Sequence, residues 1–530
     1  MSVRNGVALF IALATFALLV ACGGSSSPTP VAPPSGAFSN SNLNGTYVFS
    51  SSGVDANSDF LAMTGTIAAN GSGGITSGTV DLIGQEISLS SPVTQPITGG
   101  SYSITADGRG TISFNTTAIN PSSGSESGIT FTLDLVLTTS SHGLVTEYDS
   151  NGTGSGTIDL QTPVLQSQIA GNYTFGLTGT GSSGAPLAMV GSMTLGATGG
   201  VTTGLQDINN DASYTGVASL STSSFVNLTS TPGTAVIVSN SGTFSYDVYP
   251  IDSTHLKFIE TDGLNLTGDA YTQATSISSG QLVYTMAGED TSGGPIDVGG
   301  WLTNTSGTIT AGLEDFDDAG AVDTTPVSIS SGSFSTPSGG RSTLSLNGFV
   351  NGAASDLAGT YTFAAYPFTY SGGSGIQLLE IDNLGITSGA AYPQSSTALA
   401  SPPQGYGFNL SGINSGGEED DIAEFTTTSS GFSGIADLND LTSLSTGKAL
   451  SATYVAPDGN GRGSAATNYW DFNFYVVNPT TYILLETDST QVGLGTFEQQ
   501  SNSSGGSVQS VVSILRPAVR PHSALKLRKN

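Results

Sequence analysis

The chain has 530 residues, and its 40 acidic residues against 11 basic ones give a formal net charge of −29. All acidic residues lie between Asp55 and Glu498, a region with five basic residues and therefore a charge of 5 − 40 = −35. Such a surface repels nucleic-acid phosphates and anionic lipid headgroups, which excludes nucleic-acid binding, and it suits divalent cations, cationic partners or plain solubility. Charged residues make up only 10% of the chain and Gly reaches 72, so strands joined by turns are expected rather than helices.

Residues 1–22 have the pattern of a processed export signal. Arg4 precedes an apolar run, Val7 to Val20, which is too short to span a bilayer. The following Leu19-Val-Ala-Cys22 resembles the lipobox of bacterial lipoproteins. The resemblance implies cleavage before Cys22 and attachment of lipid chains that anchor the protein, whereas an ordinary secretory peptide is the alternative. Because Gly rather than Asp follows Cys22, analogy with the sorting rule of diderm bacteria favours the outer membrane of the cell envelope.

The Pro- and Ser-rich residues 23–40 are predicted to be a semi-rigid linker, partly polyproline II. Cys22 is the only cysteine, so no disulfide is expected.

One motif occurs four times. It begins with Glu-x-Asp and ends at a Gln, and a Gly stands five residues before that Gln. Its copies run from Glu147 to Gln161, from Glu260 to Gln273, from Glu380 to Gln394 and from Glu486 to Gln500. An opening aromatic pair and a central Gly-x-x-Asp recur at matching distances, which indicates a tandem array. We place the four units at 41–162, 166–274, 278–396 and 402–501.

Each unit is predicted to be an antiparallel β module. The first contains about eight short alternating segments separated by Gly, Asn, Asp and Ser clusters, which is typical of a sandwich or a small closed barrel. In a barrel, the opening Tyr-x-Phe strand pairs with the closing Gly-to-Gln strand and removes both edges. The expected fold class is therefore all-β, with four tandem barrel-like or sandwich modules. The architecture resembles that of avidins and lipocalins, without a motif specific to either family.

The repeat Glu shares a strand face with large apolar residues and needs a partner in or near the core. Arginines at one equivalent site suggest that partner in units 1, 3 and 4. The predicted pairs are Arg109 with Glu147, Arg341 with Glu380, and Arg462 with Glu486. They are read as buried bridges that fix strand register, or as groups that orient a ligand in a barrel mouth. In unit 2, Lys257 is expected to point away from Glu260, which leaves Glu260 exposed or held by hydroxyl and backbone donors.

Oxygen-bearing side chains at alternate positions follow the Gly-x-x-Asp motif. Calcium prefers six to eight oxygen ligands, often from such loops, although Asx-turns that close hairpins explain the same pattern. The candidate calcium ligands are Asp207, Asn209, Asp211, Asp315, Asp317, Asp437 and Asn439.

Catalytic signatures are weak in this sequence. His142 and His255 precede the repeat Glu in units 1 and 2 alone, and the sequence contains no nucleophile elbow, zinc-ligand spacing or phosphate loop. We therefore expect a non-catalytic, lipid-anchored envelope protein that binds an unknown ligand or partner without a cofactor. A structural or adhesive spacer is the alternative, and a glycoside-active hydrolase is the weaker one. Residues 502–530, with five basic residues, are expected to be a flexible tail.

Overall fold

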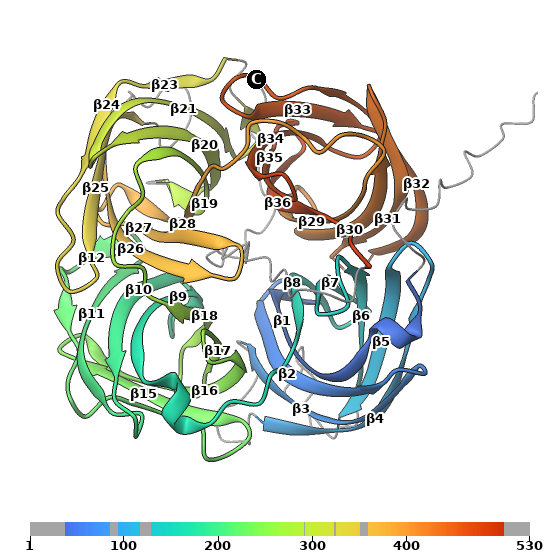
Figure 1. Ribbon diagram of the computed structural model, residues 1–530, viewed down its shortest axis with the longest axis horizontal. Helices are drawn as coiled ribbons and strands as arrows, with labels where there is room; N and C mark the ends of the chain where they lie inside the picture. Colours follow the sequence, from blue (N-terminus) through green and yellow to red (C-terminus); the bar gives the residue numbers. More distant parts are fainter. Residues whose placement is uncertain are drawn as a thin grey trace, which may run out of the picture. The chain divides into compact units, whose positions relative to one another are not determined.

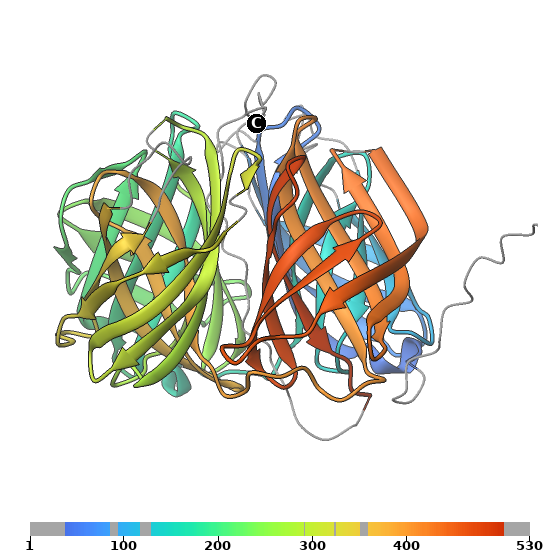
Figure 2. The ribbon, with the colours of Figure 1, turned by 90° about the horizontal axis from the view of Figure 1, so that it is seen from above.

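Antiparallel strands make up most of the chain that the computed structural model describes (Figure 1). The described residues are 38–84, 94–116, 129–290, 292–322, 325–349, 359–441 and 443–502. Two short 3₁₀ helices, η1 (Asn40–Asn42) and η2 (Gln166–Ile169), precede the first two modules. Seen from the side in Figure 2, the long strands of each module run alongside one another.

Module 1 is a closed barrel in which each strand pairs with its neighbours in sequence and β8 returns to β1. Its strands are β1 (Asn44–Asp55), β2 (Phe60–Asn70), β3 (Gly74–Gly84), β4 (Thr94–Ile104), β5 (Arg109–Thr116), β6 (Ile129–Leu137), β7 (His142–Tyr148) and β8 (Gly152–Leu160).

Module 2 forms a sheet that the strand ladder does not close, because β14 is not a ladder partner of β11, β12 or β13. A single bridge from Gly200 to Phe225 spans this seam. The strands are β9 (Gly171–Thr180), β10 (Pro186–Leu195), β11 (Val201–Asn210), β12 (Ser213–Tyr214), β13 (Ala218–Ser219), β14 (Phe225–Asn227), β15 (Gly233–Ser239), β16 (Gly242–Asp252), β17 (His255–Glu260) and β18 (Asn265–Thr272).

Module 3 closes through β20–β21 pairing, with two short strands, β22 and β23, beside β21. Its strands are β19 (Gly280–Asp290), β20 (Pro295–Thr305), β21 (Thr308–Asp318), β22 (Ala321–Val322), β23 (Val327–Ile329), β24 (Ser331–Phe334), β25 (Ser342–Phe349), β26 (Gly359–Tyr370), β27 (Gly373–Glu380) and β28 (Gly385–Pro393).

Module 4 is again a closed barrel of eight strands. They are β29 (Gly405–Asn414), β30 (Glu418–Thr427), β31 (Gly431–Asp440), β32 (Ser443–Val455), β33 (Arg462–Thr467), β34 (Asp471–Asn478), β35 (Thr481–Glu486) and β36 (Gln491–Gln499). The predicted fold class, four tandem antiparallel barrel-like modules, is confirmed, with module 2 left open at its seam.

The opening strand of each module pairs with its closing strand, as predicted. This pairing explains the fixed Gly of the repeat motif. A Cβ atom at Gly156 would lie 1.8 Å from the carbonyl oxygen of Ser50, and one at Gly268 would lie 2.0 Å from that of Gly176. Side chains at these positions would force the two strands apart, so the closing strand requires Gly there.

Apolar side chains fill the interior of each module. In module 1 the tilted rings of Phe49, Phe114 and Phe131 contact one another in series, with centroid separations of 5.5 and 5.7 Å. In module 4, Phe408 stacks on Trp470 at 4.9 Å. The barrels are therefore packed cores whose aromatic rings occupy the space that a hollow lipocalin-like barrel leaves for a ligand.

The outer faces of many strands are buried as well, because the modules contact one another. Strands of modules 1 and 2, 2 and 3, 3 and 4, and 4 and 1 pack together, so the series of contacts returns to its start. We call these contacts junctions 1–2, 2–3, 3–4 and 4–1. Strand β7 illustrates the result, since all seven of its residues are buried. Within the described residues, no helix has the length and apolar character needed to cross a membrane.

Candidate functional site

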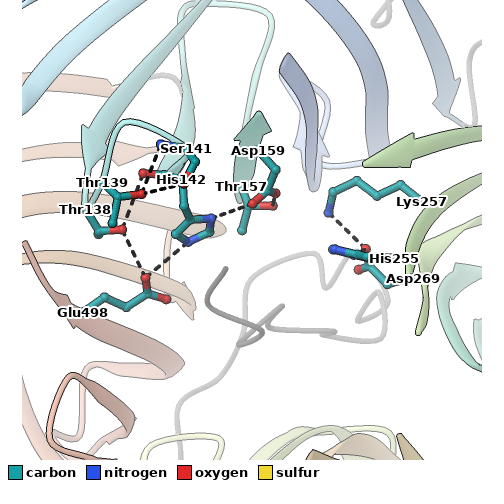
Figure 3. A network of polar contacts seen from close by, with 10 residues as sticks. All are labelled: Thr138, Thr139, Ser141, His142, Thr157, Asp159, His255, Lys257, Asp269 and Glu498. Carbon is teal, nitrogen blue, oxygen red and sulfur yellow. Dashed lines mark hydrogen bonds and ion pairs between the residues drawn. The ribbon is translucent and has the colours of Figure 1, made fainter. Parts of the chain in front are cut away.

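A buried network of ionisable side chains lies where modules 1, 2 and 4 meet (Figure 3). Strand alternation places these groups on the outer faces of their barrels. On β8, Ile158 points into the core of module 1, so the next residue, Asp159, points out. On β17, Leu256 and Phe258 point into the core of module 2, which turns Lys257 outward as predicted.

The first half of the network connects module 1 to module 4 through His142. Its Nδ1 lies 2.7 Å from an oxygen of Asp159, and its Nε2 lies 3.2 Å from an oxygen of Glu498 on β36. Thr157 donates a hydrogen bond of 3.0 Å to the other oxygen of Asp159. The imidazole therefore bridges two carboxylates that belong to different modules.

The second half belongs to module 2. Lys257 Nζ donates a hydrogen bond of 3.1 Å to Asp269, and His255 Nε2 lies 2.7 Å from the same oxygen. The His255 ring stacks on Tyr271, whose ring stacks on Phe368 of module 3. Lys257 is only 2% exposed, so its charge depends on this carboxylate for compensation.

The electrostatic state of the network follows from this pairing. Burial alone lowers the pKa of His142, but the charges of Asp159 and Glu498 outweigh it and raise the pKa to about 10. Burial raises the pKa of Asp159 and of Asp269, but the nearby cations outweigh it and lower both values. At neutral pH His142 is thus an imidazolium held between two carboxylates.

This geometry makes His142 part of an ion clamp rather than a general base. Both of its ring nitrogens face carboxylate oxygens, and its raised pKa keeps it protonated over the physiological range. A general base must accept a proton near the working pH, which this imidazolium does not do. Sequence reasoning noticed His142 and His255 but missed Asp159, Asp269 and Glu498. All three lie on the closing strand of a module, between the fixed Gly and the fixed Gln. Alternation along that strand places them on its outer face, and this was the signal that could have identified them.

The predicted Arg–Glu bridges are wrong. Each arginine instead binds an Asp of the preceding module in the series of contacts. Arg341 donates to Asp207 through Nε at 2.6 Å and Nη2 at 2.9 Å. Arg462 donates to Asp315 in the same way, at 2.6 and 2.7 Å. The third arginine, of module 1, contacts an oxygen of Asp437 in module 4 at 3.3 Å.

Strand faces explain this error. Arg462 lies opposite Tyr475, which points outward, whereas Glu486 lies opposite Phe472, which points into the core of module 4. The same division separates Arg109 from Glu147 and Arg341 from Glu380. Because alternate residues of a strand point to opposite sides of the sheet, the two partners of each predicted bridge lie on different faces of the barrel wall.

In units 2, 3 and 4 the repeat Glu instead accepts hydrogen bonds from the segment that follows it. Glu260 accepts backbone hydrogen bonds from Asp262 at 3.0 Å and Leu264 at 2.9 Å. Glu486 accepts one from the backbone of Asp488. Glu380 accepts one from the backbone and one from the hydroxyl of Thr387 on β28. Glu260 is fully buried, so of the two predicted outcomes for unit 2, retention by backbone donors is correct and exposure is wrong.

The fixed Gln of the repeat docks one module onto the next at junctions 1–2, 3–4 and 4–1. Its side-chain amide donates to a backbone carbonyl of the following module. The acceptors are Pro250 for Gln161, Val476 for Gln394, and Leu137 for Gln500. In three junctions the repeat Gln also lies against the Gly that directly precedes the arginine that binds the neighbouring module. A Cβ atom on that Gly would be 1.9–2.5 Å from the side-chain nitrogen of the Gln. Asp, Gln and Gly-Arg thus form one recurring contact between modules, completed at junction 1–2 by Tyr249 donating to Asp81.

The candidate calcium ligands do not converge on one site. Asp207, Asp315 and Asp437 bind the arginines of neighbouring modules. Asn209 and Asn439 donate their amides to backbone carbonyls of the next module, and Asp211 lies in a turn with φ 54°. Among the described residues, no group of three or more His, Cys, Asp or Glu side chains is arranged to hold a metal ion.

Two grooves at the junctions are lined by residues that the structure describes. The first has a volume of about 600 Å³ and is lined by β10, β11 and Gln273 of module 2 together with the loop Ser338 to Gly340 of module 3. The second, of about 210 Å³ at junction 1–2, lies between Gln161 and the segment around Pro232. The lining of the first groove is mostly Ser, Thr, Asn and Gly, with Met193, Leu205 and Leu220 as its apolar members.

Some predictions concern residues outside the described ones. Cys22 with its lipobox, most of the 23–40 linker and the basic tail beyond residue 502 belong to this group. At the end of the predicted linker, however, Phe38 is buried in the core of module 1 and Asn40 accepts a hydrogen bond from the backbone of Ile104. These residues therefore belong to the folded module.

Comparisons with known proteins give no family. No known protein family and no curated protein matches the sequence. Among solved structures, kievitone hydratase from Nectria haematococca aligns with 42% of this chain and 90% of its own, at 10% identity and a TM-score of 0.16. A mutant of transferrin binding protein B from Haemophilus parasuis aligns with 68% of this chain and 84% of its own, at 10% identity and a TM-score of 0.20. These scores are too low to indicate a shared function.

Proposed function

We propose that this chain is an exported, lipid-anchored protein of the cell envelope that binds an uncharged, hydroxyl-rich ligand in the groove at junction 2–3. The observation that carries the proposal is where open space occurs. Packed aromatic and aliphatic side chains fill the module interiors, whereas a groove of about 600 Å³ lies between modules 2 and 3. A volume in this range is typical of small-molecule sites.

The side chains that line the groove support an uncharged, hydroxyl-rich ligand. The lining contains no charged side chain, and the hydroxyls and backbone groups of its Ser, Thr and Gly residues are suited to neutral donors and acceptors. The apolar side chains of Met193 and Leu220 offer a surface for the carbon skeleton of a sugar or a short peptide. The strong negative charge of the whole chain disfavours anionic ligands.

A blocked groove tests this proposal. Thr202, which lines the groove, is exposed and is replaced with Trp to fill it. Thr310 is the equivalent exposed residue of module 3 and does not line this groove, so Thr310→Trp is the matched control. The mature protein and both variants are applied to an array of neutral oligosaccharides and peptides. We expect binding by the mature protein and by Thr310→Trp, and at least a tenfold loss for Thr202→Trp, while equal binding by both variants would move the site elsewhere.

The anchoring part of the proposal rests on Leu19-Val-Ala-Cys22. Cys22→Ser removes the sulfur that carries the diacylglycerol, and with it the buried CH₂ groups that hold the protein to a bilayer. We expect this variant to move from the membrane fraction to the soluble fraction on centrifugation of cell lysates. Membrane association that survives the substitution would refute lipid anchoring at this residue.

A structural spacer is the second candidate, and the filled cores and the closed series of junctions favour it. It predicts that a fully folded protein binds nothing on the array. The two functions are thus separated by the binding experiment alone.

A further inference from the structure

Two junctions share a contact made by an asparagine amide. At junction 2–3, Asn209 donates 2.9 Å hydrogen bonds to the carbonyl oxygens of Glu380 and Gly385. At junction 4–1, Asn439 donates bonds of 2.8 and 3.0 Å to the carbonyls of Glu147 and Gly152. Each Asn follows the docking Asp of its module by two residues, and the two acceptors have the same spacing in both places.

Junction 3–4 has a carboxylic acid at this position. Asp317 follows the docking Asp315 by two residues, and the repeat spacing puts the carbonyls of Glu486 and Gln491 where the Asn amides find their acceptors. Strand β21 contacts both β35 and β36, as this equivalence requires. An ionised carboxylate has no proton to donate to a carbonyl, whereas an asparagine amide has two.

The surroundings of Asp317 make its ionised form still less favourable. Asp297 lies directly opposite it across β20 and β21, and both side chains are fully buried. One oxygen of Asp317 accepts a 2.9 Å hydrogen bond from Gly320, and the other, Oδ2, has no hydrogen-bond partner among the described residues. Like charges directly opposite each other in a sheet destabilise it, and burial makes the repulsion stronger.

Junction 4–1 shows how the fold accommodates an acid at the opposite position. There Asp420 lies across from Asn439 and accepts hydrogen bonds from Thr153 at 2.9 Å and Ser155 at 2.7 Å. The residues that correspond to Thr153 and Ser155 in module 4 are Val492 and Leu494, which have no side-chain hydroxyl. Junction 3–4 has therefore exchanged the asparagine and both hydroxyl donors for an acid and two apolar side chains.

We propose that Asp317 is a neutral carboxylic acid in the native protein and that its proton replaces the asparagine amide in junction 3–4, which makes this junction a pH-sensitive contact between modules. The other ionisable groups that face it are Asp297 and Asp318 within module 3 and Glu486 and Asp488 in module 4. The arginine of this junction, Arg462, is held by Asp315. Loss of the proton places a further negative charge among these carboxyls and weakens the contact.

The direction of the Asp317 pKa shift is consistent with this proposal. Burial, followed by the charges of Asp297, Asp318 and Asp488, raises the pKa of Asp317 well above its ordinary value, against a smaller opposing effect of the Gly320 hydrogen bond. Between the unfolded and the folded pKa, the native state holds a proton that the unfolded state lacks. Stability therefore falls as pH rises through this interval.

Asp317→Asn tests the proposal, because it installs the amide that the other junctions use. Unfolding by denaturant at several pH values from 5 to 9 gives the number of protons linked to folding. We expect Asp317→Asn to unfold at the same denaturant concentration as the native chain at pH 5, at a higher one at pH 8, and with about one fewer linked proton. Infrared spectra should also show loss of one protonated carboxyl C=O band.

The reverse substitutions keep the test independent of this one variant. Asn439→Asp and Asn209→Asp should each add about one linked proton and lower stability more at pH 8 than at pH 5. Adding calcium chloride distinguishes a protonated Asp317 from an Asp317 that binds a cation. If millimolar calcium stabilises the native chain at pH 8 and has no effect on Asp317→Asn, a cation fills this position and the proposal is overturned. An unchanged pH profile in Asp317→Asn overturns it equally.

Discussion

Replacing Arg341 with Leu should lower the free energy of unfolding by about 3–5 kcal/mol, because it leaves a buried carboxylate without its cation. Asp207 is fully buried and accepts two hydrogen bonds from this guanidinium, in addition to one from Tyr366 at 2.6 Å and one from Tyr214 at 2.5 Å. The two tyrosines remain in the variant, but they do not neutralise the charge. Denaturant unfolding at pH 7 measures the effect.

Two further variants control for the loss of packing. Arg341→Leu combined with Asp207→Asn removes both charges and keeps an acceptor for the tyrosines, so it should recover most of the loss. Arg109→Leu should cost less than Arg341→Leu, because Arg109 reaches Asp437 through one contact of 3.3 Å instead of two short ones and also pairs with the partly exposed Asp107. Equal costs for Arg341→Leu and Arg109→Leu would contradict this account of the junctions.

The second large effect concerns the ion clamp and its pH dependence. Replacing His142 with Gln should destabilise the protein by about 3–5 kcal/mol at pH 6, because Asp159 and Glu498 lose the cation between them. The unfolded imidazole titrates near 6.5, whereas the folded pKa is about 10. The stabilisation by His142 is therefore complete below about pH 6.5 and is lost as pH rises through about 10.

Comparing the native chain with His142→Gln across pH 6 to 10 isolates this contribution. The gap between their unfolding free energies should be widest at pH 6 and should narrow toward pH 10. Adding Asp159→Asn and Glu498→Gln to the variant should restore stability, because both carboxylates are then replaced by neutral amides and no buried negative charge remains to be compensated. A gap that stays constant over this pH range would show that His142 contributes packing and not charge.

Sequence reasoning succeeded where the physical cause is local and repeated. The four copies of the Glu-to-Gln motif predicted four modules, and alternation with turn residues predicted antiparallel strands. The fixed Gly even marks where the opening and closing strands touch, since a side chain at Gly156 has no room. It failed to predict the seam of module 2, where β12, β13 and β14 are two or three residues long and leave almost no periodic pattern.

The site was harder to predict, because the junctions bury both faces of the strands. Alternation separates inside from outside only when one face meets water, and β7 has no such face. Arg109 and Asp437 are 328 positions apart in a single sequence, and nothing local connects them. One signal was present nevertheless. A Gln that ends every unit, and a Gly before each of three arginines, serve no need of an isolated barrel, so their recurrence indicates contacts between units.

Both ends of the described chain leave from one place. Asn42, just before β1, donates a hydrogen bond to Asn502, and the backbone of Ser501 donates to Thr138 of module 1. A force that pulls the two ends apart therefore acts directly across junction 4–1. The other three junctions carry no load until this one opens, because the covalent path between the ends runs through all four modules. Under tension the molecule should thus lengthen first at junction 4–1, because no peptide segment connects modules 4 and 1 directly.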